Sequence, residues 1–136
     1  MKDIYLIRYD NNFFDKINLS KKLDIKLNKF GIKQSKLIGN YFKKKNKQIN
    51  NIISLNTKIT YNIANIIADE INFIDEIIKL DMDINLFINY INTNDKTIII
   101  SNDKIICDII NKLCNINYYK INDYIYNIFY DNKNIY

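Results

Sequence analysis

The stretch "YLIRYD", residues 5–10, decides how the rest of the chain is interpreted. It is mostly apolar and β-favouring, and with the residues before it predicts a buried strand over 3–8 that ends at Arg8. Arg8 is the only arginine beside 19 lysines. An exposed ion pair, worth about 0–1 kcal/mol, would tolerate lysine, whereas a bidentate contact requires the guanidinium. We therefore interpret Arg8 as an anion-binding residue, with structural pairing to a carboxylate as the alternative.

Short apolar runs alternate with helical patterns along the rest of the chain. Further strands are predicted over 51–54, 76–80, 96–101 and 124–130, and a last one from Ile135. Helices are predicted over 31–45, 57–71, 84–93 and 103–114, with a loop over 9–28 and a turn over 131–134. The alternation predicts one α/β domain over residues 1–136, with three layers and a mostly parallel sheet flanked by helices.

Polar residues follow several of the predicted strands. Arg8, Ser54, Ser101 and Asn102 all fall at carboxyl ends. Ligands of such sheets bind beyond these ends, where helix N-termini direct their amides at anions. We therefore expect Arg8, Ser54 and Asn102 to converge at one edge of the sheet.

The composition is skewed toward residues with AT-rich codons. The chain has 32 isoleucines and 24 asparagines, and no proline, histidine or tryptophan. A genome under strong AT bias explains this composition most simply, because such bias converts arginine to lysine and removes glycine and proline. Composition therefore indicates mutation bias more than function, and no cofactor or metal site is predicted.

The charge of the chain permits an anionic partner. Its net charge is +5 and its pI is about 9.0. The densest basic cluster comprises Lys43, Lys44, Lys45 and Lys47. We interpret it as the solvated end of an amphipathic helix, where cations suit the helix dipole, with a nucleic-acid patch as the alternative.

The cysteines and the N-terminal residues indicate a compartment. Cys107 and Cys114 lie two helical turns apart, about 10 Å, which is too far for a disulfide. We expect both to be small core residues in a reducing compartment. Lys2, Asp3 and Arg8 interrupt any signal-peptide pattern, and no apolar run is long enough to span a membrane. The expected location is the cytoplasm.

Two motifs carry a family resemblance. The first strand runs into Arg8-Tyr9-Asp10, and "LNKFGIKQSKLIG" (27–39) contains the only two glycines of the chain. This order resembles the histidine phosphatase superfamily, with its phosphoglycerate-mutase-like fold. Its members open with a strand into Arg-His-Gly and continue with Leu-x-x-x-Gly-x-x-Gln-Ala-x-x-x-Gly. The likeness covers roughly residues 3–131 and is greatest to bacterial phosphohistidine phosphatases.

The resemblance assigns three further positions. The family's second strand is followed by an arginine and a helix, and "IISLNTKITYNIANIIA" (52–68) is similar to this pattern. The arginine position falls on Lys58 when counted from the strand, which we prefer, and on Ile59 when counted back from the helix. Asp81 is nearest to the family's acidic position, and Asn102 stands where the second histidine would be.

In that family one histidine attacks phosphorus, while the other histidine and two arginines hold the phosphoryl oxygens. The resemblance therefore implies phosphate binding by Arg8, Lys58 and Asn102. It implies no catalytic residue at the two histidine positions, since Tyr9 and Asn102 occupy them. A tyrosine, whose pKa is near 10, needs a base to act as a nucleophile. We expect Tyr9 to fill the mouth of the pocket instead.

Three functions remain open at this point. We favour a catalytically inactive relative of phosphohistidine phosphatases with a weakened phosphate pocket around Arg8, which binds a phosphorylated protein or a small phosphate ligand. The second is an active phosphatase with unorthodox residues. The third is a nucleic-acid-binding domain, which we disfavour because strands favour tyrosine anyway and no arginine accompanies these rings. Its stacking residues would be Tyr118, Tyr119, Tyr124, Tyr126 and Tyr130.

Overall fold

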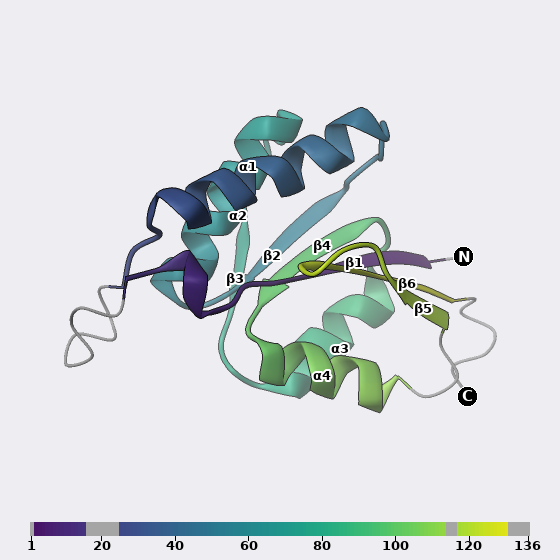
Figure 1. The fold of residues 1–136 in the computed structure, drawn as a ribbon. Coiled ribbons are helices and arrows are strands. Elements are labelled where there is room, and N and C mark those ends of the chain that lie inside the picture. The colour runs from purple at the N-terminus through teal and green to yellow at the C-terminus, as the bar shows by residue number, and fades with distance from the viewer. Residues whose placement is uncertain (1, 16–24, 114–116, 131–136) are drawn as a thin grey trace.

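The computed structural model describes residues 2–15, 25–113 and 117–130. Within these residues one sheet is covered by helices on both faces (Figure 1). Its strands are β1 (Lys2–Arg8), β2 (Asn51–Leu55), β3 (Ile78–Leu80), β4 (Thr97–Ser101), β5 (Asn117–Lys120) and β6 (Ile125–Tyr130). The helices are α1 (Lys29–Lys44), α2 (Lys58–Ile71), α3 (Ile84–Thr93), α4 (Asp103–Lys112) and the short 3-10 helix η1 (Asn11–Phe13). The predicted three-layer α/β architecture is confirmed.

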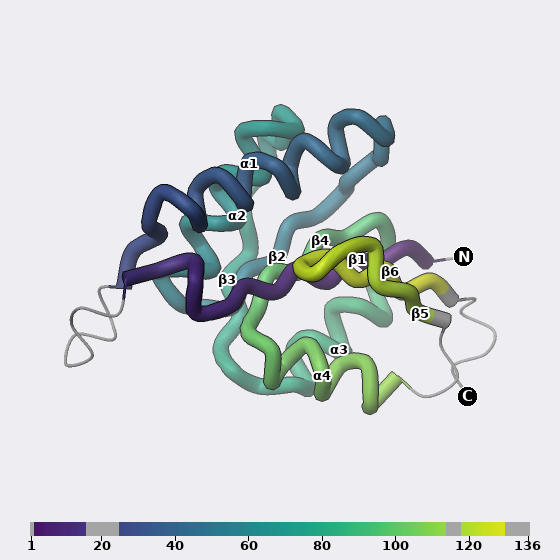
Figure 2. The backbone as a smooth tube through the Cα atoms, viewed as in Figure 1, coloured from purple at the N-terminus to yellow at the C-terminus, as the bar shows by residue number. Residues whose placement is uncertain are grey.

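The sheet is parallel in its centre and antiparallel at one side. Its strand order is β3-β2-β4-β1-β6-β5. Strands β1 to β4 pair in parallel, whereas β6 runs antiparallel to β1 and to β5 (Figure 2). Arg8 lies opposite Ser101, and Ser54 lies opposite Ile100. Because parallel strands end at the same edge, the chain delivers Arg8, Ser54 and Asn102 to one edge, as predicted.

Alternate side chains of the central strands enter two separate cores. Tyr5 and Ile7 pack in the core under α1 and α2. Ile4 and Leu6 pack in the core under α3 and α4. A strand buried on both faces needs a continuous apolar run, which "IYLI" and "TIIIS" provide. The same alternation decides the face to which each strand-end residue is directed.

Short polar side chains determine where the helices begin. The side chain of Asn28 accepts a hydrogen bond of 2.8 Å from the amide of Gly31, so α1 begins at Lys29, two residues before the predicted start. Thr57, Asp83 and Asn102 cap α2, α3 and α4 in the same way.

Both glycines lie where another element touches α1. A Cβ on Gly31 would overlap the backbone oxygen of Phe13 and lie 2.8 Å from the side chain of Leu27. A Cβ on Gly39 would lie 2.6 Å from the Cβ of Glu70 on α2. Close contact between elements therefore explains both positions.

Two sequence predictions were wrong, and one strand was missed. Cys107 is exposed, because α4 buries Ile105, Ile106 and Ile109 while position 107 falls on its outer side. The predicted loop over 9–28 contains η1, whose Phe13 is fully buried.

Strand β5 was not predicted, because it has no apolar run and forms by pairing with β6. Cys114, the turn over 131–134 and the last strand from Ile135 lie outside the described residues. No helix in the described parts of the chain combines the length and the apolar character that crossing a bilayer requires.

Candidate functional site

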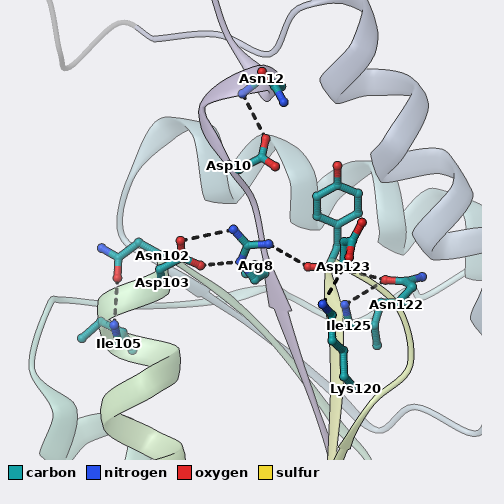
Figure 3. A network of polar contacts seen from close by, with 11 residues as sticks. Arg8, Asp10, Asn12, Asn102, Asp103, Ile105, Lys120, Asn122, Asp123 and Ile125 are labelled. Atoms are coloured by element: carbon teal, nitrogen blue, oxygen red, sulfur yellow. Dashed lines mark hydrogen bonds and ion pairs between the residues drawn. The ribbon is translucent and has the colours of Figure 1, made fainter.

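Arg8 ends β1 with its guanidinium already engaged. Its Nε and one terminal nitrogen donate to the two carboxylate oxygens of Asp103, the second bond at 3.2 Å. The other terminal nitrogen donates to the backbone oxygen of Asp123 at 2.7 Å (Figure 3). The hydrogen bond to Asp103 raises the pKa of Arg8. The structure thus shows Arg8 paired with a carboxylate, which was the alternative interpretation of this residue from the sequence.

Strand register and helix polarity explain this pair. Arg8 follows Ile4 and Leu6 on the β1 face toward α3 and α4. Asp103 is the first residue of α4, where a carboxylate interacts favourably with the helix dipole. Because Ser101 lies opposite Arg8, the start of α4 stands next to the end of β1.

Tyr9 lies on the other face of the sheet, against the core under α1 and α2. Its ring centroid is 6.3 Å from that of Phe13 and 6.5 Å from that of Phe14. Burial raises the pKa of Tyr9, and the negative charge of Asp103 raises it further. Asp10, the neighbouring base in the sequence, accepts a bond of 3.0 Å from the amide of Asn12 at the start of η1. Tyr9 is therefore a neutral phenol at neutral pH.

Asn102 shares the edge with Arg8 but is directed elsewhere. Its Oδ1 accepts a bond of 2.9 Å from the amide of Ile105. In Figure 3 its side chain is turned away from the guanidinium of Arg8. Ser101 is fully buried, and its Oγ has no hydrogen-bond partner among the described residues. Ser54 is buried too, and its hydroxyl donates to a backbone oxygen at 2.8 Å.

Lys58 and Asp81 stand farther along the same edge. Lys58 begins α2 and is exposed, whereas Ile59 is buried in the core. Of these two positions, only 58 could present a charged side chain to a ligand at the edge of the sheet. Asp81 follows β3 and accepts a bond of 3.0 Å from the side chain of Asn56. Strands β2 and β3 are the second and third from β1, or about 10 and 14 Å away. The structure therefore groups Arg8, Asn102 and Asp103, with Lys58 and Asp81 apart.

Sequence reasoning missed Asp103, although an acidic residue directly after the second-histidine position was a signal for it. Beside the Arg8–Asp103 pair, between α4 and strands β5 and β6, lies a hollow of about 270 Å³. It is lined by Arg8, Asp103, Ile106, Cys107, Ile110, Asn111, Tyr118 and Tyr126. The described residues contain no cluster of three or more side chains that could hold a metal ion.

The tyrosines proposed for base stacking do not share one surface. Tyr118 and Tyr119 are about half exposed on β5. Tyr124 packs on Phe13 with ring centroids 5.0 Å apart, and Tyr126 lines the hollow beside Arg8. The side chain of Tyr130 lies outside the described part of the structure.

Comparison with known proteins identifies the fold. No protein-family model and no curated protein matches the chain significantly. The protein histidine phosphatase SixA complexed with tungstate is similar in structure, with a TM-score of 0.72, 15% identity, and coverage of 83% of this chain and 77% of that one.

Two further structures agree. The putative phosphohistidine phosphatase SixA from Agrobacterium tumefaciens gives a TM-score of 0.64, with 12% identity over 82% of this chain and 76% of that one. Phosphoglycerate mutase from Plasmodium falciparum gives 0.57, with 17% identity over 82% and 68%. The chain thus has the α/β fold of the histidine phosphatase superfamily.

Proposed function

We propose that this protein is a phosphohistidine-phosphatase-like protein without phosphatase activity that retains a weakened phosphate-binding pocket around Arg8. The observation that carries the proposal is the two-point contact between Arg8 and the carboxylate of Asp103. A guanidinium held in this geometry suits a phosphate equally well. The similar SixA structure contains tungstate, an oxyanion, which supports an anion site on this fold.

The side chains at the histidine positions support the absence of catalysis. The chain contains no histidine. Tyr9 has a raised pKa, and Asp10, its sequence neighbour, is bonded to the start of η1. Asn102 caps α4 and is neutral. A hydroxyl nucleophile needs a base that accepts its proton or a lowered pKa, whereas the pKa of Tyr9 is raised and no base among the described residues forms a hydrogen bond with its hydroxyl.

The pocket is weakened because Asp103 brings a negative charge to the position where an oxyanion would bind. Direct binding to Arg8 requires the carboxylate to leave at least one of its two hydrogen bonds. Asn102 caps α4 and could offer only a neutral hydrogen bond, and Lys58, which stands about 10 Å along the edge, could offer only a distant point charge. Phosphate binding by Arg8, Lys58 and Asn102 is therefore proposed as weak.

Titration with tungstate and phosphate tests the binding. We expect Asp103→Asn to bind tungstate at least about tenfold more tightly than the wild type, since it frees the guanidinium and removes a like charge. Arg8→Met in the Asp103→Asn background should abolish binding. Asp123→Asn is the matched control, because only its backbone oxygen contacts Arg8, and it should change affinity less than about twofold. Unchanged affinity of Asp103→Asn would contradict the proposal.

Hydrolysis of p-nitrophenyl phosphate tests the absence of catalysis. We expect turnover no greater than that of a heat-inactivated sample, and no phosphoenzyme after acid quench. Turnover that Tyr9→Phe abolishes would instead establish the second candidate, an active phosphatase with unorthodox residues.

The partner we propose is a phosphorylated protein or a small phosphate ligand. We also propose a cytoplasmic location. The exposed free thiol of Cys107 supports it, since such thiols persist in reducing compartments.

A further inference from the structure

Helix α1 and the turn after it hold the net positive charge of the chain. Residues 29–47 contain seven lysines and no acidic residue, whereas the other 117 residues contain 13 basic and 15 acidic side chains. The solvated end of a helix explains Lys43 and Lys44. It does not explain Lys29, Lys33 and Lys36, which stand in the first half of α1, and Lys29 lies in the first turn, where the helix dipole disfavours cations.

These three lysines border a hollow of about 500 Å³ on the described part of the molecule. It is lined by Lys29, Ile32, Lys33, Lys36, Leu37, Asn40 and Glu70. Ile32 is 38% exposed and Leu37 is 49% exposed. Helix α1 already buries another face against the sheet and α2, so these apolar groups are additional to those that the fold requires.

We propose that the α1 surface (Lys29, Ile32, Lys33, Lys36 and Leu37) binds an acidic amphipathic helix of a partner protein. Charge complementarity is the basis for this choice of partner. Glutamates or aspartates of such a helix pair with the three lysines, which recur at i, i+4 and i+7 along one side of α1. Its large apolar side chains enter the hollow beside Ile32 and Leu37, in the manner of a helix bound in a groove.

Two other anionic partners fit this surface less well. Ile32 and Leu37 offer no ring on which a base can stack, and the surface contains no arginine, so nucleic acid is disfavoured. A bilayer surface is met by a broad apolar helix face, whereas here the apolar groups line a hollow that is bordered by three lysines and also lined by Glu70.

The α1 surface is independent of the Arg8 site. Helix α1 covers one face of the sheet and α4, which carries Asp103, covers the other (Figure 1). A partner bound to the α1 surface would therefore leave the pocket around Arg8 accessible, and either proposal can fail without the other.

Fluorescence anisotropy with a designed peptide tests the proposal. The probe is a labelled helical peptide with leucines at i, i+3, i+4 and i+7 and glutamates elsewhere, and its control replaces every glutamate by lysine. We expect the acidic peptide to bind and the basic one not to bind. Lys33→Glu/Lys36→Glu should weaken binding by at least about tenfold. Leu37→Ser should weaken it by about fivefold while leaving its salt dependence unchanged.

Lys104→Glu/Lys112→Glu is the matched control, since it makes the same charge change on α4, on the opposite face of the sheet. It should alter affinity less than about twofold. Amide shifts on peptide addition should map to α1. Three results would overturn the proposal: no binding of the acidic peptide, an equal loss in the α4 control, or stronger charge-dependent binding of oligo-dT or phosphatidylserine vesicles at the same lysines.

Discussion

The Arg8–Asp103 pair contributes little to stability, but its two hydrogen bonds fix the orientation of the guanidinium. The two side chains are 21% and 59% exposed, and a pair this exposed is worth only about 0–1 kcal/mol. A lysine could supply that much. The two parallel hydrogen bonds to one carboxylate need the planar guanidinium, and this explains an arginine in a chain that otherwise uses lysine.

Asn102 gives the first stability prediction. Removing its side chain leaves the amide of Ile105 without a partner, so Asn102→Ala should lower the free energy of unfolding by about 1 kcal/mol. Urea denaturation measures this change. Asn102→Asp keeps a capping oxygen and should remain near the wild type. If alanine and aspartate behave alike, Oδ1 does not act as the cap.

Helices α1 and α2 pack closely because α1 has a glycine, and therefore no side chain, at the point of contact. Gly39 admits Glu70 to a distance that a Cβ could not tolerate. Gly31 performs the same role between α1 and the backbone of η1. Both glycines cost α1 helix propensity, up to about 1 kcal/mol each relative to alanine, which the close packing offsets.

Substitution of these glycines tests that balance. Overpacking costs about 1–3 kcal/mol, which exceeds the propensity gain, so Gly31→Ala and Gly39→Ala should both lower the free energy of unfolding. Gly31→Ala should cost more, because it meets backbone. In Gly39→Ala/Glu70→Gly the side chain removed from α2 leaves room for the new methyl group on α1. The double variant should therefore lose less unfolding free energy than the sum of the losses in the two single variants. Strict additivity in chemical denaturation would refute the contact.

The molecule as a whole should be sensitive to alkali. Tyr5, Tyr9, Tyr41, Tyr90 and Tyr124 all have pKa values raised above 10, chiefly by burial. Above pH 10 the unfolded chain releases these protons while the folded chain retains them. The unfolded state then binds fewer protons, so the free energy of unfolding falls as pH rises, and the full contribution is present only below pH 10.

Tyr5 gives the sharpest test of this alkaline loss. Burial dominates its shift, and the nearby charge of Asp3 adds to it. Tyr5→Phe should leave stability at pH 7 nearly unchanged and reduce the alkaline slope by up to about 1.4 kcal/mol per pH unit. Urea denaturation between pH 8 and about pH 11.5 measures it. A slope equal to that of the wild type would show that Tyr5 ionises freely in the folded protein.

The sequence was most informative where burial on both faces leaves a continuous apolar run. That is why the strands around Ile7, Ile53 and Ile99 were predicted closely. Strand β5 has four residues and no apolar run, so its two tyrosines, although they favour strands, did not reveal an element that depends on pairing with β6.

The candidate site was likewise predicted only in part. The edge position of Arg8 could be predicted from strand order. Its partner was missed, because Asp103 is 95 residues away in sequence and meets Arg8 through the pairing of β1 with β4, and its place directly after Asn102 was the one signal for it.

The Arg8–Asp103 pair also determines which ligands can compete for the guanidinium. Both groups belong to one chain, so Asp103 acts as a tethered competitor whose effective concentration lies in the millimolar range or above. Only the fraction of molecules with Asp103 displaced can bind an anion directly, and the apparent dissociation constant rises accordingly. A free phosphate at micromolar concentration would leave the pair closed. A phosphoryl group on a larger partner would compete better, because the partner's further contacts add binding free energy that offsets the displacement of Asp103 from Arg8.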